Sequence, residues 1–359
     1  MPQETVHGHD PTVSIIITNY QDRENLVTCL SAVSKTNYSS FEIIVVDYGT
    51  EDLERSVTSK MPQVKLLHLD EDRGVASARN IGVLNSHGEL LVFLDNDTVP
   101  DPDWLKKAVP LFTTYSHVGA IQPLLLDSSN PTLVDSAGSF IDVSGYPMER
   151  GRLFDLQRES EVAFRETEPI FGACSAALIV RREVLERVGG FDDTFIIQLE
   201  DLDLSWRIRL AGYGIFLVPD SKVLHGRRSK AAKDSVYSRK REFYSLRNQM
   251  LCLIKNMGGR SLLLNLPSVA ASNVVRCLMP RKAISVLALR AFLWNMIALH
   301  ASLGNRRSIQ NIVRRVPDSE FEAFIVPFPV ILVDVLFGRE ALVRLVRALL
   351  QKRKRDNPF

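Results

Sequence analysis

Cysteine is scarce in this chain of 359 residues, and it never occurs in closely spaced pairs. The four cysteines are far apart and form no Cys-x-x-Cys motif; they are Cys29, Cys174, Cys252 and Cys277. This spacing argues against a cysteine-rich zinc site and a disulfide framework. It predicts a protein of a reducing compartment, which we expect to be the cytoplasm.

Long apolar runs are also lacking. The first twelve residues are polar, and the run that follows, Val13–Thr18, is too short for the core of a signal peptide. No stretch reaches the roughly 18 uncharged apolar residues expected of a membrane span. Ser261–Val275 comes nearest, but two asparagines and a proline interrupt it. A net charge of +2 argues against a nucleic-acid partner.

Acidic residues are absent from one long region. None occurs between Glu242 and Asp318, whereas Lys or Arg occupies eleven positions there. We expect 256–359 to form a helical C-terminal region with apolar helical segments at 261–275, 283–303 and 323–350. These helices either lie on a membrane surface or pack on the core or in a homodimer, and both interpretations stay open. The cations expected to face anionic headgroups are Arg276, Arg281, Lys282, Arg290 and the tail Lys352–Arg355.

The first part of the chain, 1–255, alternates between strand-like and helix-like segments. The expected strands include Val13–Thr18, Phe41–Val46, Val64–Leu69 and Leu90–Leu94, and the expected helices include Glu24–Ser34, Val75–Asn85 and Asp101–Tyr115. Further on we expect an amphipathic helix over Leu199–Gly212 and short strands at Ile215–Val218 and Lys222–Leu224. Short connections between such segments predict an α/β fold with a doubly wound, mostly parallel sheet. The region 127–168 is rich in Ser, Gly and acidic residues, and we expect irregular loops there.

Two aspartates one residue apart follow the buried strand Leu90–Leu94. Alone, Asp95-Asn96-Asp97 is a weak signal, because Asp-Asn pairs also form solvated turns. Polar residues at other strand ends, such as Thr18 and Asp47, strengthen it, because open α/β sheets bind ligands at the carboxyl ends of their strands. Two carboxylates there suit Mg²⁺ or Mn²⁺ held together with substrate phosphates.

The ordered motifs of 12–255 resemble those of the family 2 glycosyltransferases, which have the GT-A fold, and in particular rhamnosyltransferase-like members. The motifs are Val13–Tyr20, Glu42–Thr50, Gly74–Gly82, Phe93–Trp104, Phe171–Leu178, Gly190–Asp192, Glu200–Arg207 and Pro219 with His225. The resemblance implies inverting transfer of a sugar from a nucleotide diphosphate to a hydroxyl group. Tyr48 departs from the family pattern, which often has Asn or Asp there.

The resemblance also implies which residues bind the nucleotide sugar. They are Thr18, Tyr20, Asp47, Arg79, Asp95, Asn96 and Glu200. Asp47 resembles the residue that accepts a hydrogen bond from a pyrimidine imide, which favours a UDP- or dTDP-linked donor. Two alternatives remain, namely Asp47 as a helix N-cap and Arg79 as a surface salt-bridge partner.

Metal-binding and catalytic roles follow from the same resemblance. We expect Asp97 and His225 to bind the divalent cation, and Asp95 to contact the ribose or a metal-bound water. His225 could instead be an ordinary hydrogen-bonded residue at a strand end. Asp201 resembles the catalytic base that takes the acceptor proton. The alternative for this acidic segment is a charged first turn that favours the helix dipole.

The expected acceptor is a saccharide or a lipid-linked saccharide, at the cytoplasmic face of a membrane if the C-terminal helices bind lipid. Trp104 and Trp206 could stack on a sugar, although single tryptophans in helices are more often core residues. A sugar nucleotidyltransferase is disfavoured, because no Gly-rich loop follows the first strand. A non-catalytic nucleotide- or carbohydrate-binding protein is the other alternative.

Overall fold

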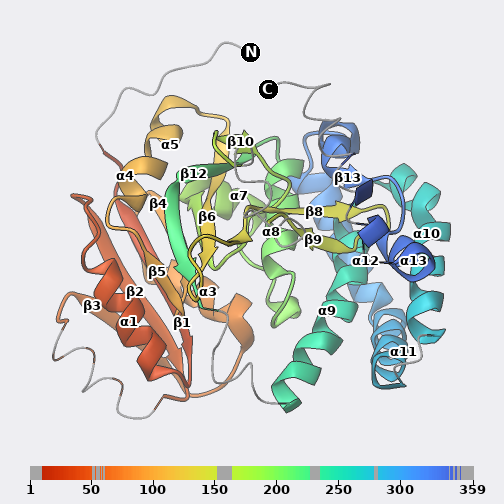
Figure 1. Cartoon of the computed structure of the whole chain (residues 1–359), viewed down its shortest axis with the longest axis horizontal. Coiled ribbons are helices and arrows are strands. Elements are labelled where there is room, and N and C mark those ends of the chain that lie inside the picture. The colour runs from red at the N-terminus through yellow and green to blue at the C-terminus, as the bar shows by residue number, and fades with distance from the viewer. Residues whose placement is uncertain are drawn as a thin grey trace.

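The computed structural model describes residues 10–50, 61–151, 164–226, 235–278 and 282–338, with single positions in 53–59 and 340–348. Figure 1 shows a twisted sheet with helices on both faces in the first two thirds of the chain, and a group of helices beside it formed by the last third. Arg281 and the basic tail Lys352–Arg355 lie outside the described residues, as does the side chain of Lys282.

The main sheet has the order β10-β12-β6-β11-β4-β1-β2-β3. Its strands are β1 (Val13–Tyr20), β2 (Phe41–Tyr48), β3 (Val64–Leu69), β4 (Leu90–Asp95), β6 (Val118–Asp127), β10 (Glu168–Pro169), β11 (Ala177–Arg181) and β12 (Gly214–His225). β3, β2, β1 and β4 run parallel, and β11 lies antiparallel between β4 and β6. The predicted α/β sheet with a parallel core is confirmed.

Successive residues of a strand point to opposite faces, so the sheet has two apolar layers. On β1, Ile15 and Ile17 pack with α1 (Arg23–Val33). Ile16 lies in the opposite layer, with α3 (Gly74–Leu84) and α8 (Glu200–Leu210). The two layers hold the strand ends rigidly, and these ends carry the candidate site.

Prolines change two of the expected elements. The helix expected over Asp101–Tyr115 is divided into α4 (Trp104–Ala108) and α5 (Pro110–Thr114), because a proline inside a helix lacks an N–H group and clashes with the preceding turn. The two short strands expected near Pro219 form the single strand β12, with a register shift between Val218 and Lys222.

The expectation of irregular loops over 127–168 is wrong for part of that region. It contains β7 (Val134–Ser136), β8 (Ser139–Asp142), β9 (Pro147–Glu149) and the first residue of β10. β7 pairs with β6, whereas β8 lies between β9 and β13 (Ile325–Val326) in a second sheet. β7, β8 and β9 have only three or four residues each, which is too short for an alternating pattern, and β13 is distant in sequence, so local composition did not indicate the strands.

Helix α8 was expected to be amphipathic, but it is buried almost all round. Its charged side chains have protein partners: Arg207 donates to Asp203 and to the carbonyls of Val188 and Gly190. Arg209 donates to the Phe171 carbonyl. Buried charges are tolerated when they are paired in this way, so a charged face does not have to face solvent.

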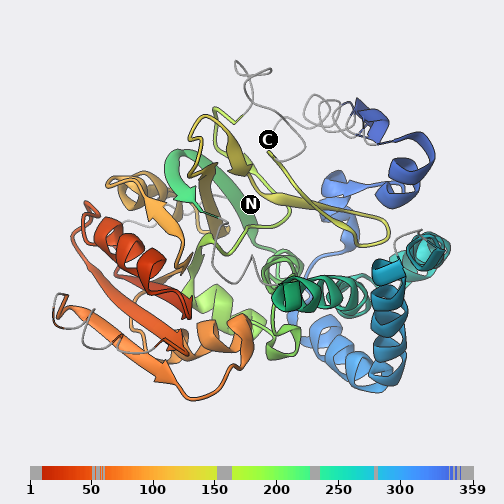
Figure 2. The same cartoon turned by 60° about the horizontal axis from the view of Figure 1, so that its bottom comes forward.

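The C-terminal region is helical, as expected. It contains α10 (Gly259–Leu278), α11 (Lys282–Ile297), α12 (Leu299–Ser308) and α13 (Val330–Phe337). α11 and α12 pack against α9 (Ser235–Asn256), which was not predicted and which also contacts α8, whereas α10 packs against α11 and α13 (Figure 2). The expected boundary at 255 falls at the end of α9.

The expectation that no segment is long and apolar enough to cross a membrane has to be revised. α10 has 20 residues and a mean hydropathy of 1.2, and 11% of its apolar window is buried. A second candidate is a pair of helical segments, Ser285–Ile297 and Leu299–Val313, bent by 65°. The mean hydropathy of α10 is this high because it is averaged over a long window. In that window the apolar residues outweigh Asn265, Pro267 and Asn273, which interrupt the apolar run in the sequence.

Candidate active site

A cavity of about 450 Å³ lies at the carboxyl ends of β1 and β4. Its lining includes Thr18, Tyr20, Arg79, Asp95, Asn96, Asp97, Glu200 and His225, which were predicted from the sequence. The topology explains this convergence, because the parallel strands β1 and β4 end at the same edge of the sheet. β12 adds His225 through its antiparallel pairing with β5 (Thr98–Pro100).

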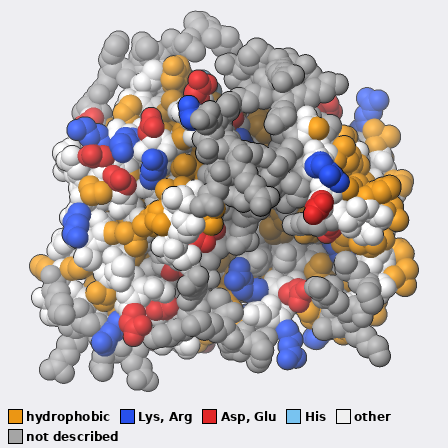
Figure 3. Space-filling model, in the orientation of Figure 1, with side chains coloured by type: hydrophobic (Ala, Val, Ile, Leu, Met, Phe, Trp, Pro, Cys, Tyr) orange, Lys and Arg blue, Asp and Glu red, His pale blue; other side chains and the backbone are white. Residues whose placement is uncertain are grey.

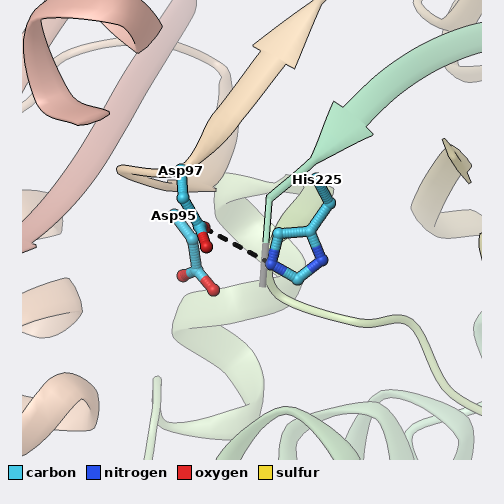
Figure 4. Close-up of side chains that lie close together, drawn as sticks. All are labelled: Asp95, Asp97 and His225. Carbon is cyan, nitrogen blue, oxygen red and sulfur yellow. Dashed lines mark ion pairs between the residues drawn. The ribbon is translucent and has the colours of Figure 1, made fainter. Parts of the chain in front are cut away.

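Asp95, Asp97 and His225 form a cluster at the cavity wall (Figure 4). One potential ligand atom of each residue lies within 4.8 Å of those of the other two. His225 Nε2 is 3.4 Å from Asp97 Oδ1. Two carboxylates and an imidazole suit Mn²⁺ and also Mg²⁺. The structure therefore places Asp95, which was expected on the nucleoside side, in the same cluster as Asp97 and His225.

His225 has a second partner that the sequence did not reveal. Its Nδ1 lies 2.8 Å from Asp135 Oδ2 of β7. Burial lowers the pKa of His225, but the hydrogen bonds to Asp135 and Asp97 outweigh it and raise this pKa to about 10. When one ring nitrogen of a histidine binds a metal, a carboxylate that is hydrogen-bonded to the other nitrogen fixes the orientation of the ring. Asp135 was missed because it lies in the region expected to be irregular.

Arg79 connects the cluster to the acidic start of α8. Its side chain is 2% exposed and donates to Asp95 Oδ1 at 2.9 Å and to Glu200 Oε1 at 2.7 Å. It is therefore neither a surface salt bridge nor a free guanidinium, because both terminal nitrogens bind protein carboxylates. The other carboxylate oxygen of Glu200, Oε2, is buried without a hydrogen-bond partner in the described part of the chain.

Asp201 is half-buried and faces a different segment from Glu200. Its Oδ2 accepts a hydrogen bond from the Ser175 amide at 3.1 Å, and Oδ1 accepts one from the Leu202 amide at 2.8 Å. Desolvation, together with the charge of Glu200, raises the pKa of Asp201 to about 7. Asp201 is not among the residues that line the cavity, but it lies close enough to Arg79 for their charges to interact.

Asp47 is fully buried and also does not line the cavity. Its carboxylate accepts hydrogen bonds from Asn19 Nδ2 at 2.6 Å and Thr50 Oγ1 at 2.7 Å. Asn19 in turn accepts a hydrogen bond from Asn96 at 2.5 Å. The structure thus places Asn19, which was not predicted, between Asp47 and the cavity-lining Asn96. Pyrimidine recognition by Asp47 stays a prediction.

Aromatic rings gather on one side of the cavity. Tyr20 stacks on Tyr48 with ring centroids 5.5 Å apart, and Tyr237 of α9 lies on Tyr20 at 6.4 Å. Tyr48, which departs from the family pattern, thus supplies a ring rather than a carboxylate or amide. Trp104 and Trp206 are 0% and 1% exposed, so both are core residues and not sugar platforms.

Helix α9 supplies cavity residues that were missed. Tyr237, Lys240 and Arg241 line the cavity, and Lys240 Nζ is 3.3 Å from Asp72 Oδ2. The signal was present in the sequence as the basic run Arg239-Lys240-Arg241. Arg227 and Arg228 closely follow His225, so the sequence also suggests phosphate contacts from them, but both lie outside the described residues.

Comparison with known proteins points to one family. Residues 14–189 match the family described as Glycosyl transferase family 2. Glycosyltransferase AglE of Haloferax volcanii is 31% identical over 221 residues, which cover 58% of this chain and 65% of AglE. The dTDP-rhamnosyl transferase RfbF of Shigella flexneri is 24% identical over 258 residues, which cover 68% of this chain and 80% of RfbF.

Among solved structures, GalNAc-T7, crystallised with UDP, GalNAc and Mn²⁺, has a TM-score of 0.58. It is 17% identical, and the match covers 82% of this chain and 57% of GalNAc-T7. This likeness shows the GT-A fold and no more. Residues 14–189 thus match glycosyltransferase family 2, and the ordered motifs and the fold agree with this match.

Proposed function

We propose that this protein is an inverting glycosyltransferase that moves a sugar from a UDP- or dTDP-linked donor to a hydroxyl group of an acceptor. The proposal rests mainly on the surroundings of Arg79, which lies near both a candidate cation site and a candidate base. Arg79 lines the cavity that also contains the Asp95, Asp97 and His225 cluster, and its charge interacts with Asp201, a carboxylate with a raised pKa. Transfer from a nucleotide diphosphate needs both a site for the leaving group and a base.

The donor fits the cavity by charge and shape. The stacked Tyr20 and Tyr48 offer an aromatic surface for a base, and Lys240 and Arg241 offer positive charge for phosphates. Asp95, Asp97 and His225 would hold Mn²⁺ or Mg²⁺. When bound, such a cation neutralises the charge that develops on the leaving diphosphate. UDP in GalNAc-T7 and the name of RfbF support a pyrimidine nucleotide.

Asp201 acts as the general base in this proposal. A pKa of about 7 lets its carboxylate accept a proton near neutral pH, which is the condition for effective base catalysis. The oxygen of the acceptor hydroxyl forms the new bond to the anomeric carbon as the bond to the diphosphate breaks. Its proton passes to Asp201, and attack from the face opposite the leaving group inverts the anomeric centre.

For the acceptor we propose a saccharide or a lipid-linked saccharide, as in the synthesis of cell-surface polysaccharides. Support comes from the matched relatives: RfbF is named a rhamnosyl transferase, and another relative is an O-antigen biosynthesis protein. The protein would then work in the cytoplasm, at the membrane that holds the lipid-linked acceptor. The acceptor would approach from the side of Ser175, where Asp201 lies.

A panel of nucleotide sugars tests this function. We expect UDP- or dTDP-sugars with Mn²⁺ to raise the melting temperature, because a ligand that binds only the folded state stabilises it by mass action. The stabilising donor is then assayed for transfer to saccharide and lipid-linked acceptors. If no nucleotide sugar shifts melting, or if the stabilising donor is transferred with retained configuration, the proposal is wrong.

A further inference from the structure

The C-terminal helices α10 and α11, which pack against each other, expose many apolar side chains, which we together call the apolar face. Its main residues are Leu263, Val274 and Leu278 of α10 and Leu289, Leu293 and Ile297 of α11. Leu263 is 69% exposed, Leu278 76% and Ile297 86%. Figure 3 shows apolar side chains gathered along the edge of the molecule where α10 and α13 lie. A contiguous patch of this kind marks an interaction site.

Charge around the apolar face indicates what covers it. The exposed cations Arg260, Arg290 and Arg307 lie on α10, α11 and α12, and no acidic residue occurs from 243 to 317. A second copy docked on the same face would bring these arginines together without carboxylates from this region to pair with them. An anionic lipid surface complements both the apolar side chains and the cations. We propose that the apolar face docks the protein on an anionic membrane.

The docking is peripheral, because the other side of α10 is attached to the protein. Arg276 is 4% exposed and lies 5.4 Å over the ring of Tyr146 in the β8–β9 turn. Leu262 and Val269 pack against the main core. Crossing the membrane would require α10 to leave these contacts and would place Arg276 in hydrocarbon. Lying in the interface keeps them and still buries the apolar face.

Flotation of the full chain with lipid vesicles tests the membrane proposal. We expect flotation with phosphatidylcholine vesicles that contain phosphatidylglycerol, and at least about tenfold weaker binding to pure phosphatidylcholine. The double variant Leu263→Glu/Leu293→Glu should lose binding by a similar factor. Leu84→Glu on α3 is the matched control, since Leu84 is 84% exposed but lies away from the face, and it should float like wild type.

Four results would overturn membrane docking. They are absence of flotation, equal binding to neutral vesicles, resistance of the bound protein to alkaline carbonate, and a wild-type dimer that the double variant dissociates. The wild-type comparison of the two lipid mixtures needs no variant, so it decides the matter even if the double variant folds poorly. Donor binding is measured without vesicles. Loss of donor binding, which would contradict the proposed function, is therefore distinguishable from loss of membrane docking.

A second inference concerns the loop that leads into α8, and it rests on the proposed function. Ile196, Gln198 and Leu199 have φ angles of 62°, 71° and 64°. The left-handed region is unfavourable for residues other than glycine, so surrounding contacts must hold this loop. The loop contributes Ile196, Ile197 and Gln198 to the cavity wall and ends at Glu200 and Asp201.

The contacts that hold the loop come from α9. Asn248 is fully buried, and its side-chain amide lies 3.0 Å from the Phe195 carbonyl, 2.9 Å from that of Ile197 and 2.6 Å from that of Gln198. Arg247 donates to Asn248 Oδ1 at 2.7 Å and so orients the amide. We infer that Asn248 is a positioning residue that fixes the loop and, through it, Asp201.

Replacement of Asn248 separates positioning from simple stability. We expect Asn248→Ala to lower kcat by about 10- to 100-fold through misplacement of Asp201, with a smaller loss of donor affinity because Ile197 and Gln198 of the loop also line the cavity. Gln249→Ala is the matched control, because Gln249 is also a buried α9 amide but donates to the Ser144 carbonyl, away from the loop. It should lose stability to a similar extent and keep kcat.

The outcomes separate this inference from the function on which it rests. An active wild type with equal kcat values for Asn248→Ala and Gln249→Ala would overturn positioning by Asn248. A wild type that transfers no sugar would instead contradict the proposed function. Asn248→Asp provides a second variant of nearly the same size, and we expect it to fail like alanine, because a carboxylate cannot donate to three carbonyls.

Discussion

The acidic cluster after β4 and the acidic start of α8 are joined by Arg79 but differ in environment. Asp95 and Asp97 converge with His225 on one point in an open cavity. Glu200 and Asp201 are adjacent in sequence, yet one binds Arg79 and the other binds the Ser175 amide. In the proposed mechanism, the converging carboxylates suit a cation, whereas the separate Asp201 carboxylate is available as a base.

The largest expected effect concerns the base. Asp201→Asn should lower the transfer rate by about 10²- to 10⁴-fold, because the amide cannot take the acceptor proton. Donor affinity should stay unchanged, since Asp201 does not line the cavity. Rates and donor affinities are measured for Asp201→Asn and for Glu200→Gln. Near wild-type transfer by Asp201→Asn, with loss of transfer in Glu200→Gln, would move the catalytic role to Glu200.

A similarly large effect is expected at the cluster of Asp95, Asp97 and His225. Asp97→Asn should abolish the Mn²⁺-dependent thermal stabilisation by the donor, and EDTA should do the same to wild type, because a neutral amide is a weaker ligand for a hard cation. Asp220→Asn is a matched control, since Asp220 is exposed on the same strand as His225. Full activity of wild type in excess EDTA would remove Asp97 and His225 from the metal role.

A smaller effect is expected at Asp135, which contacts His225 of this cluster. Asp135→Asn should weaken Mn²⁺ affinity by about 10- to 100-fold, because the carboxylate orients His225 and increases its basicity. The affinity is measured by titration of Mn²⁺ in the presence of nucleotide. Unchanged affinity would mean that Asp135 serves only the packing of β7.

The smallest expected effect is on stability. The pKa of Asp201 is raised to about 7 in the folded protein, above its unfolded value, so the folded state binds more protons between the two values. Asp201 therefore lowers wild-type stability as pH rises through this window. We expect Asp201→Asn to gain on the order of 1–3 kcal/mol over wild type between about pH 5 and pH 8. A gain independent of pH would show that the pKa is not raised.

The parallel part of the sheet and most of the cavity could be predicted from the sequence. Apolar runs that end in polar residues identified β1, β2 and β4, and their order placed Thr18 and Asp95 together. Very short strands were not predictable, because pairing with a neighbouring strand decides them rather than a local pattern. Asp135 lies on a strand formed by pairing with β6, and Asn248 lies on a helix whose amphipathic pattern was overlooked.

Burial was the other property that the sequence did not reveal. Arg79 looked equally suited to a phosphate or to the surface, and the structure places it between two carboxylates. Helix α8 looked amphipathic because its charges follow a regular spacing, but their partners come from 171, 188–190 and α9. Periodicity indicates which residues share a face, and only the fold decides what that face meets.

The cation-dependent binding of the donor nucleotide is best tested by calorimetry. The stabilising UDP or dTDP nucleotide is titrated into the protein once with Mn²⁺ and once with EDTA. The titration asks whether the cavity between β1, β4, β12 and α9 binds a nucleotide diphosphate through Asp95, Asp97 and His225. We expect nucleotide binding with Mn²⁺ that weakens by at least about tenfold in EDTA, and equally weak binding to Asp97→Asn under both conditions. Equal wild-type affinity with Mn²⁺ and with EDTA would contradict this expectation.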